Sequence, residues 1–206
     1  MAGDWAFEGL TPLRYGAIIA DPPWAYQNYS VKGQGKGAAG QYGCMATADI
    51  AALPVNQLAA PDCALLMWGT FPMMPDALAL MKAWGFEFKT GGPWAKQSST
   101  GAKWAFGTGY IFRAAAEFFI VGTIGRPKIR SRSVRNLIVA PTRGHSRKPD
   151  EQYALVESLF DGPYAELFAR QRHPGWDAWG NQTDKFQAAN ANDADSPHSL
   201  TTGGGA

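Results

Sequence analysis

The stretch YGAIIADPPW, residues 15–24, decides the fold expected for this chain of 206 residues. Its first six residues form an apolar run that is typical of a short buried strand. Neither proline of the following DPPW can donate a ladder hydrogen bond, so the chain must leave the sheet directly after Asp21. An acidic side chain, a rigid turn and the aromatic Trp24 are therefore expected at the carboxyl end of a strand. In open α/β sheets, this edge is where ligands bind.

The turn indicates methylation of an amino group on a flat base. The exocyclic nitrogen of adenine is a poor nucleophile because its lone pair is delocalised into the ring. The Asp21 carboxylate and the Pro22 carbonyl, held rigid by the fixed φ of proline, would accept hydrogen bonds from its two N–H groups. They would stabilise the positive charge that grows on the nitrogen during methyl transfer. Trp24 or Tyr26 is placed to stack on the base. The alternative is a proline turn that only ends a strand, with a solvated Asp21 and a packed Trp24.

Length and composition fit one α/β domain, residues 1–186, followed by a disordered tail, residues 187–206. No stretch has the ~20 apolar residues needed to span a bilayer, and the first residues lack the pattern of a signal peptide. Cys44 and Cys63 are therefore expected to be reduced thiols in a cytoplasmic protein. The three histidines show no metal-binding spacing, so we expect neither a metal nor a membrane partner. A homodimer is left open.

Strand and helix patterns alternate along the chain, which predicts a mostly parallel sheet with helices on both faces. Thr47 is expected as a helix N-cap, and Pro149 as the opening of a helix that ends near residue 160. A glycine-rich loop over residues 30–43 is long enough to close over a substrate. Further strands are expected at 63–68, 86–96, 117–123, 136–140 and 164–169, a helix at 75–84, and a loop at 98–109. A second loop is expected after 164–169, followed by the segment 179–182.

The net charge of +2 conceals an uneven distribution. Residues 82–148 carry 13 basic and 2 acidic side chains, a balance of +11, whereas both flanking thirds are acidic. Such a block is typical of a protein with a polyanion partner, although an isolated basic run is usually a solvated loop. We expect nucleic-acid contacts from aromatic and basic side chains of this block and of the segment after Trp24: Tyr26, Lys32, Lys36, Tyr42, Trp94, Lys96, Arg126, Lys128, Arg130, Arg132 and Arg135. Trp94 and Trp104 would add stacking surfaces, although burial in the core is the alternative for both.

A methyltransferase also needs a site for S-adenosylmethionine. Glu166 lies on the strand expected at 164–169, where a carboxylate usually holds ribose hydroxyls. Ser146 and Lys148 precede the expected helix, whose amino end would attract the carboxylate of the donor. Asn181 and Gln182 offer amide groups, although loop capping is an alternative role for both. No Gly-x-Gly-x-x-Gly segment is present, which disfavours NAD or FAD.

Five segments resemble, in order, those of the MTA-seventy family of adenine-amine methyltransferases, named after the seventy-kilodalton subunit of the mRNA adenosine methyltransferase. The resemblance covers about residues 15–185. The segments are DPPW at 21–24, YGCM at 42–45, SRKPDE at 146–151, ELFAR at 166–170 and WDAWGNQ at 176–182.

This resemblance implies a class I, Rossmann-like methyltransferase fold with permuted motif order, in which the catalytic turn precedes the donor-binding strand. It implies S-adenosylmethionine as cofactor and a catalytic turn made of Asp21, Pro22, Pro23 and Trp24. The implied donor contacts are Asp21, Ser146, Lys148, Glu166, Phe168, Arg170, Arg172, Asn181 and Gln182. Two features depart from the eukaryotic members: the glycine-rich loop is longer, and no RNA-targeting module precedes the domain.

The small size resembles bacterial and phage members, many of which are thought to act on DNA. We therefore expect transfer to the N6 amine of adenine in DNA. Three alternatives remain: the same reaction on RNA, a catalytically silent nucleic-acid-binding partner, and methylation of a protein amide. The last is disfavoured because related turns for glutamine substrates begin with Asn rather than Asp.

Overall fold

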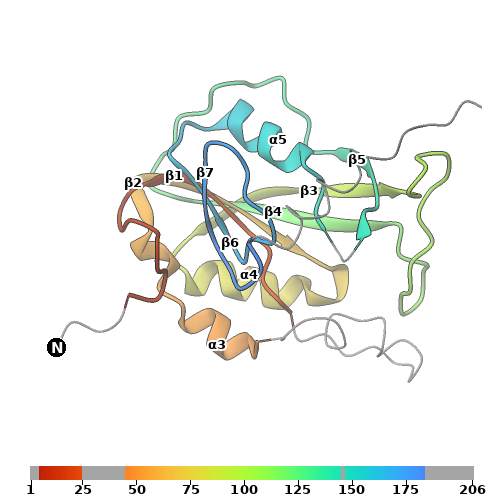
Figure 1. Cartoon of the computed structure of the whole chain (residues 1–206), viewed down its shortest axis with the longest axis horizontal. Helices are drawn as coiled ribbons and strands as arrows, with labels where there is room; N and C mark the ends of the chain where they lie inside the picture. Colours follow the sequence, from red (N-terminus) through yellow and green to blue (C-terminus); the bar gives the residue numbers. More distant parts are fainter. Residues whose placement is uncertain (1–4, 25–44, 145–146, 184–206) are drawn as a thin grey trace, which may run out of the picture.

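A seven-stranded sheet lies at the centre of the computed structural model, which describes residues 5–24, 45–144 and 147–183 (Figure 1). The strand order is β5-β3-β4-β2-β1-β6-β7. The strands are β1 Tyr15–Ala20, β2 Ala59–Gly69, β3 Glu87–Gln97, β4 Ala116–Ile124, β5 Ile138–Pro141, β6 Tyr164–Leu167 and β7 Trp176–Trp179. The helices are α3 Thr47–Ala52, α4 Met74–Ala83 and α5 Glu151–Leu159, with short 3-10 turns η1 Val55–Gln57 and η2 Phe71–Met73.

The direction of the strands determines which loops meet. β1 lies between β2 and β6 and is parallel to both. β4 is antiparallel to β2 and to β3, whereas the β3–β5 and β6–β7 pairs are parallel. Of the strands described, six therefore point one way and only β4 points the other. The predicted mostly parallel, Rossmann-like sheet is confirmed, and the crevice between β1 and β6 is its switch point, because the chain continues from β1 to β2 on the opposite side.

Helices cover both faces of the sheet, with α3 and α4 on one side and α5 on the other (Figure 1). Successive residues of β1 point to opposite faces, so that Ile18 packs in the core under α3 and α4 while Ile19 packs under α5. In α4 the buried residues Ala77, Leu80 and Met81 have the spacing of one helical face. The predicted arrangement of helices on both faces is confirmed.

The amino ends of two helices differ from the prediction. Thr47 is the first residue of α3 rather than its N-cap, and no side chain caps that end. Helix α5 begins after its N-cap Asp150, so Pro149 precedes the helix instead of opening it. The Asp150 carboxylate does not cap the helix because other side chains bind it, as described below.

Strand lengths also differ. β2 begins at Ala59, four residues before the predicted start, and β7 was predicted as a loop because its four residues are too few to show a period. β6 ends at Leu167 rather than at Ala169. The cause is Phe168, whose φ of 60° lies in the left-handed region and cannot continue a strand.

The described residues contain neither a membrane-spanning helix nor a cluster of metal ligands. None of their helices is both long enough and apolar enough to cross a membrane. Nor do three or more histidine, cysteine, aspartate or glutamate side chains gather there as a metal site would require. Cys63 is a buried free thiol, and burial raises its pKa to about 12. Cys44 and the tail predicted at 187–206 lie outside the described residues.

Candidate active site

The DPPW turn is held at both ends. The Asp21 N–H donates to the Leu167 carbonyl at 3.4 Å, which ties the start of the turn to β6. The Trp24 indole N–H donates to the Trp68 carbonyl at 3.2 Å, which ties its end to β2. Within the turn, the Trp24 N–H donates to the Pro22 carbonyl at 2.8 Å. Asp21 is therefore fixed at the carboxyl end of β1, as the sequence predicted, and lies beside the switch point of the sheet.

A chain of ion pairs extends from Asp21 along this edge. Lys148 Nζ lies 2.9 Å from both carboxylate oxygens of Asp21, and Arg170 Nη2 lies 3.9 Å from Asp21 Oδ2. Lys148 Nζ also lies 3.3 Å from Glu117 Oε2, and Glu117 is paired in turn with Lys96. These five side chains are between 12% and 18% exposed. Three cations and two carboxylates leave one net positive charge at the edge.

The ion pairs keep the cluster charged despite its burial. Burial alone would raise the pKa of Glu117, but Lys148 and Lys96 hold that pKa below its ordinary value. Burial alone would lower the pKa of Lys148, but Asp21 and Glu117 hold it above its ordinary value. Both groups are therefore ionised at neutral pH, which fixes the direction of the electric field around Asp21.

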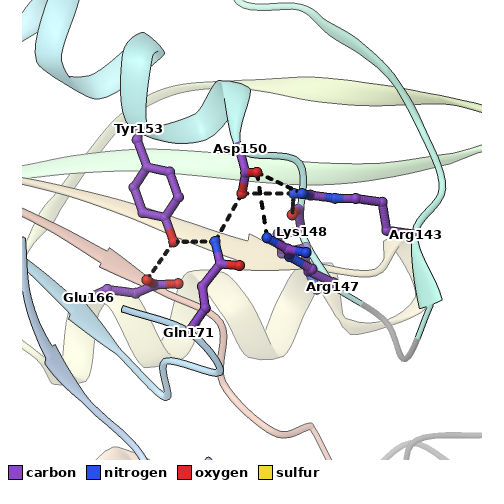
Figure 2. Close-up of polar contacts among 7 residues, drawn as sticks. All are labelled: Arg143, Arg147, Lys148, Asp150, Tyr153, Glu166 and Gln171. Carbon is purple, nitrogen blue, oxygen red and sulfur yellow. Dashed lines mark hydrogen bonds and ion pairs between the residues drawn. The ribbon is translucent and has the colours of Figure 1, made fainter. Parts of the chain in front are cut away.

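A second network anchors the segment that carries Lys148. The Arg143 guanidinium donates to both oxygens of Asp150 at 2.6 and 2.8 Å and to the Lys148 carbonyl at 2.5 Å (Figure 2). Arg147 Nη2 lies 3.6 Å from the same Asp150 carboxylate. The short segment between β5 and α5 is thus closed on itself by a bidentate contact, which restricts the position of Lys148.

The same network reaches β6 on the other side of the crevice. Gln171 Nε2 donates to Asp150 at 2.9 Å and to the Tyr153 hydroxyl at 3.1 Å (Figure 2). The Tyr153 hydroxyl donates to Glu166 Oε2 at 2.7 Å. Helix α5, β6 and the residues after β6 are therefore joined by side-chain hydrogen bonds. The distance between Lys148 and Arg170 is set by this connection.

The residues after β7 pack against the end of β6. A Cβ atom on Gly180 would lie 2.6 Å from the Ala169 carbonyl oxygen and 2.7 Å from the Ala169 nitrogen. The two backbones approach each other closely because Gly180 has no side chain. Phe168, at the turn after β6, packs edge to face on Trp179 with ring centroids 5.4 Å apart. The following residues, Asn181 and Gln182, thus begin at the carboxyl edge of the sheet.

The site just described lies within a stretch of sequence that matches a known family. The MT-A70 family profile matches residues 15–182, most of the chain. The chain belongs to the MT-A70 family. This membership confirms the resemblance seen in the five motifs and the prediction of a methyltransferase.

Individual members of the MT-A70 family are similar to the chain over most of its length. It is 31% identical to the type II methyltransferase M.MunI from Mycoplasma sp over 199 residues, covering 86% of this chain and 81% of that protein. It is 31% identical to the human N(6)-adenine-specific methyltransferase METTL4, covering 84% of this chain and 38% of that protein. It is 28% identical to human METTL3, an N(6)-adenosine-methyltransferase catalytic subunit, and spans 28% of that protein.

The residues at the edge fit S-adenosylmethionine, the donor that MT-A70 methyltransferases generally use. The two positive charges of Lys148 and Arg170 exceed the single negative charge of Asp21, which suits the donor's carboxylate. Gln171 Oε1 is buried without a hydrogen-bond partner among the described residues, so it is an acceptor that a hydroxyl group could use. Because the Gly180 backbone lies close to that of Ala169, the amides on either side of Gly180 lie at the same edge.

Gly180 is expected to be indispensable to this MT-A70 site. Replacing it by alanine should lower the melting temperature and weaken S-adenosylmethionine binding roughly tenfold or more, because the new Cβ would contact backbone atoms that cannot move aside. Gly144→Ala is the matched control, since a Cβ there has no atom within 4 Å. Thermal denaturation and calorimetric donor titration measure both effects. Equal behaviour of the two variants would show that the close approach does not matter.

Glu166 is the most buried acid of the network. Burial raises its pKa to about 7; the Tyr153 hydrogen bond opposes this rise, and the charge of Asp21 adds to it. The folded chain therefore holds this proton more tightly than the unfolded chain does. The contribution of Glu166 to stability is fully present below its ordinary pKa and is lost as the pH rises through about 7.

Glu166→Gln should remove this pH dependence because glutamine resembles the protonated acid. We expect the difference in the free energy of unfolding, variant minus original chain, to increase by up to about 3 kcal/mol from about pH 5 to about pH 8. Urea denaturation at both pH values measures the difference. A constant difference across this range would contradict a raised pKa at Glu166.

The structure brings several predicted donor residues together and separates others. Asp21, Lys148 and Arg170 converge at one edge, and Glu166 and Phe168 lie on the β6 side of the same crevice. Arg172 is exposed on the following loop, next to His173, which stacks on Tyr153. The predicted Ser146, Tyr26, Lys32, Lys36 and Tyr42 lie outside the described residues.

Two tryptophans considered for stacking on a base, Trp24 and Trp94, are core residues, which was the alternative role for both. Trp24 is 7% exposed and its indole is hydrogen-bonded to the end of β2, so it anchors the turn rather than stacking on a base. Trp94 is 3% exposed, and its indole N–H donates to the Ala140 carbonyl at 2.9 Å. Lys96 lies beside it and is part of the ion-pair chain, not of an open binding surface.

The predicted basic surface does not gather at the site. The Arg126 backbone N–H donates to the Asp62 carboxylate, near the amino end of β2, at 2.7 Å, and Arg130 Nε lies 3.5 Å from Asp161, which precedes β6. Because β4 runs antiparallel, the segment that follows it starts at the edge opposite Asp21. Its other predicted contacts, Lys128, Arg132 and Arg135, are exposed.

Sequence reasoning missed Glu117 and the Tyr153–Gln171 hydrogen bond. Glu117 was seen only as the first residue of an apolar strand. A charged residue that opens such a strand is a usable indication, since the strand end lies at a sheet edge. Gln171 and Tyr153 gave no indication, because a hydrogen bond across 18 residues of sequence has no local pattern.

Proposed function

We propose that the chain transfers a methyl group from S-adenosylmethionine to the exocyclic N6 amine of adenine in DNA. The observation that supports this most strongly is the fixed carboxylate of Asp21 at the switch point, paired with Lys148 and approached by Arg170. A carboxylate in this position meets the need of a poor amine nucleophile for an acceptor.

The residues of the turn would act on the amine. Asp21 would accept a hydrogen bond from one N–H group of the amine, since its carboxylate offers about four acceptor positions and Lys148 occupies only part of them. The Pro22 carbonyl accepts one hydrogen bond from Trp24 and keeps a second lone pair for the other N–H bond. Both acceptors stabilise the positive charge on the nitrogen, and Asp21 lies where the departing proton can be received.

Other residues would orient the reactants. S-adenosylmethionine supplies a methyl group on a positively charged sulfur. Lys148 and Arg170 would hold the carboxylate of the donor and keep Asp21 in one orientation. Asn181 and Gln182 would bind its polar groups at the same edge, and the Phe168 ring would supply an apolar surface. Orientation of this kind lowers the barrier because less freedom is lost during the reaction.

DNA is favoured over RNA by the comparison that covers most of both chains. M.MunI, a type II methyltransferase from Mycoplasma sp, is matched over 81% of its length, in keeping with the resemblance to small bacterial members from which a DNA substrate is expected, whereas human METTL3 is matched over 28%. RNA is the second candidate because METTL3 is an adenosine methyltransferase. The silent-partner alternative fits less well, since the acidic turn and its two cations are assembled.

The test uses labelled S-adenosylmethionine, the full chain and four matched oligonucleotides. These are DNA and RNA, each single- and double-stranded, with one adenine apiece. We expect label in DNA, recovered as N6-methyladenine. Label in RNA alone would replace DNA by RNA as the substrate, and binding of all four without transfer would favour the silent partner.

A further inference from the structure

Exposed aromatic side chains are concentrated in one loop. Five of the twelve large hydrophobic side chains that are exposed among the described residues lie between residues 104 and 112. We call residues 98–115, which connect β3 to β4, the aromatic loop; Figure 1 shows it projecting from the right-hand end of the sheet in lime green. Such a patch marks a binding surface more often than chance exposure. Its exposed members are Trp104 (63%), Phe106 (78%), Tyr110 (50%), Ile111 (89%) and Phe112 (83%).

Backbone hydrogen bonds order the aromatic loop. The Ala105 N–H donates to the Lys96 carbonyl at 2.8 Å, and the Gly107 N–H donates to the Ala114 carbonyl at 2.9 Å. A Cβ on Gly109 would lie 2.2 Å from the Phe112 carbonyl oxygen, so the tip requires glycine there. The aromatic side chains are thus presented outwards by an ordered backbone, which reduces the entropy lost on binding.

The loop lies at the edge that carries Asp21. It leaves the sheet after Gln97 and returns at Ala116, directly beside Lys96 and Glu117 of the ion-pair chain. The loop contains two basic residues and no acidic residue. The guanidinium of Arg113 lies 4.8 Å from the Phe106 ring centroid, and Lys103 is exposed. Flat rings next to cations suit bases joined by phosphates.

We infer that the aromatic loop binds the nucleotides that flank the target adenine. Bases next to the target stack on Phe106 and Phe112, while Lys103 and Arg113 pair with phosphates. This inference rests on the proposed function. It assigns to the loop, which includes Trp104, the contacts that the sequence had distributed over Trp94, Trp104 and the basic segment after β4. Stacking of the neighbours also compensates for the unstacking that an extruded base requires.

The test compares three double variants in the full chain. Phe106→Ala with Phe112→Ala removes both rings, and Phe106→Leu with Phe112→Leu keeps apolar area without a stacking face. Ile129→Ala with Leu137→Ala is the matched control, because both side chains are 50% exposed on the segment between β4 and β5. The probe is a single-stranded DNA oligonucleotide with 2-aminopurine next to its only adenine. Fluorescence anisotropy reports affinity, and 2-aminopurine emission reports stacking.

We expect the alanine and leucine variants to lose affinity roughly tenfold or more and to lose the change in 2-aminopurine emission. The control should keep both, and all variants should bind S-adenosylmethionine with unchanged affinity. Unchanged oligonucleotide affinity in the alanine variant, with methyl transfer intact in the original chain, would overturn the loop's role alone. A shift from dimer to monomer on sedimentation without loss of affinity would also overturn it, since the loop would then contact a second copy. Failure of the original chain to bind or methylate any oligonucleotide would overturn the proposed function itself.

Discussion

Replacement of Asp21 by alanine is expected to abolish methyl transfer. The variant loses the acceptor that would stabilise the charge on the amine, an effect typically of about 100- to 1000-fold per lost group. Donor binding should remain largely in place, because Lys148 and Arg170 are still present to hold the donor's carboxylate. Steady-state kinetics with an adenine oligonucleotide should show the loss in kcat rather than in KM alone.

Asp21→Asn is the matched control for shape. Asparagine keeps a carbonyl oxygen but carries no charge, so it separates the field of the carboxylate from its volume. We expect a loss of kcat close to that of the alanine variant, with S-adenosylmethionine binding largely retained by calorimetry. Near-original turnover in either variant would end the assignment of Asp21 as a catalytic residue.

Replacement of Lys148 by methionine is expected to have the second-largest effect. Methionine has a similar length but no charge, so Asp21 and Glu117 lose the cation that separates them. Removing one partner of a buried ion pair leaves a charge uncompensated, and we expect a loss of about 3 kcal/mol in the free energy of unfolding. Donor binding and transfer should both fall, because Lys148 orients Asp21 and would meet the donor's carboxylate. Urea denaturation and calorimetry measure the two effects.

A double variant separates the structural from the functional part of this loss. In Lys148→Met, Glu117 keeps only Lys96 as a partner, so adding Glu117→Gln should cost less stability than Glu117→Gln costs in the original chain. Donor binding should not recover, since Glu117 does not replace the cation. Additive losses of stability would show that Lys148 and Glu117 do not interact.

The central part of the site could be predicted because its determinants are local. An apolar run followed by two prolines places Asp21 at a strand end with no knowledge of the rest of the chain. The positions of Lys148 and Arg170 followed from motif resemblance, and the structure shows both within reach of Asp21. Short motifs of this kind carry positional information that survives wide sequence change.

The remaining features depend on the direction of one strand. No residue of β4 indicates that it runs antiparallel, yet this direction brings Glu117 to the site and takes Arg126 away from it. Exposure was equally hidden: Trp94 is buried and Trp104 is exposed, although each is followed by alanine and has a lysine within two residues. Pairing direction and burial are set by contacts between distant segments, which composition does not record.

The most direct test of the central claim is a single-turnover reaction of the original chain and Asp21→Asn with labelled donor. The substrate is an oligonucleotide with one adenine, digested to nucleosides for mass spectrometry. The predicted result is label on N6 of adenine with the original chain and none with the variant at equal donor occupancy. Label on another atom, or equal yields from both proteins, would contradict the account.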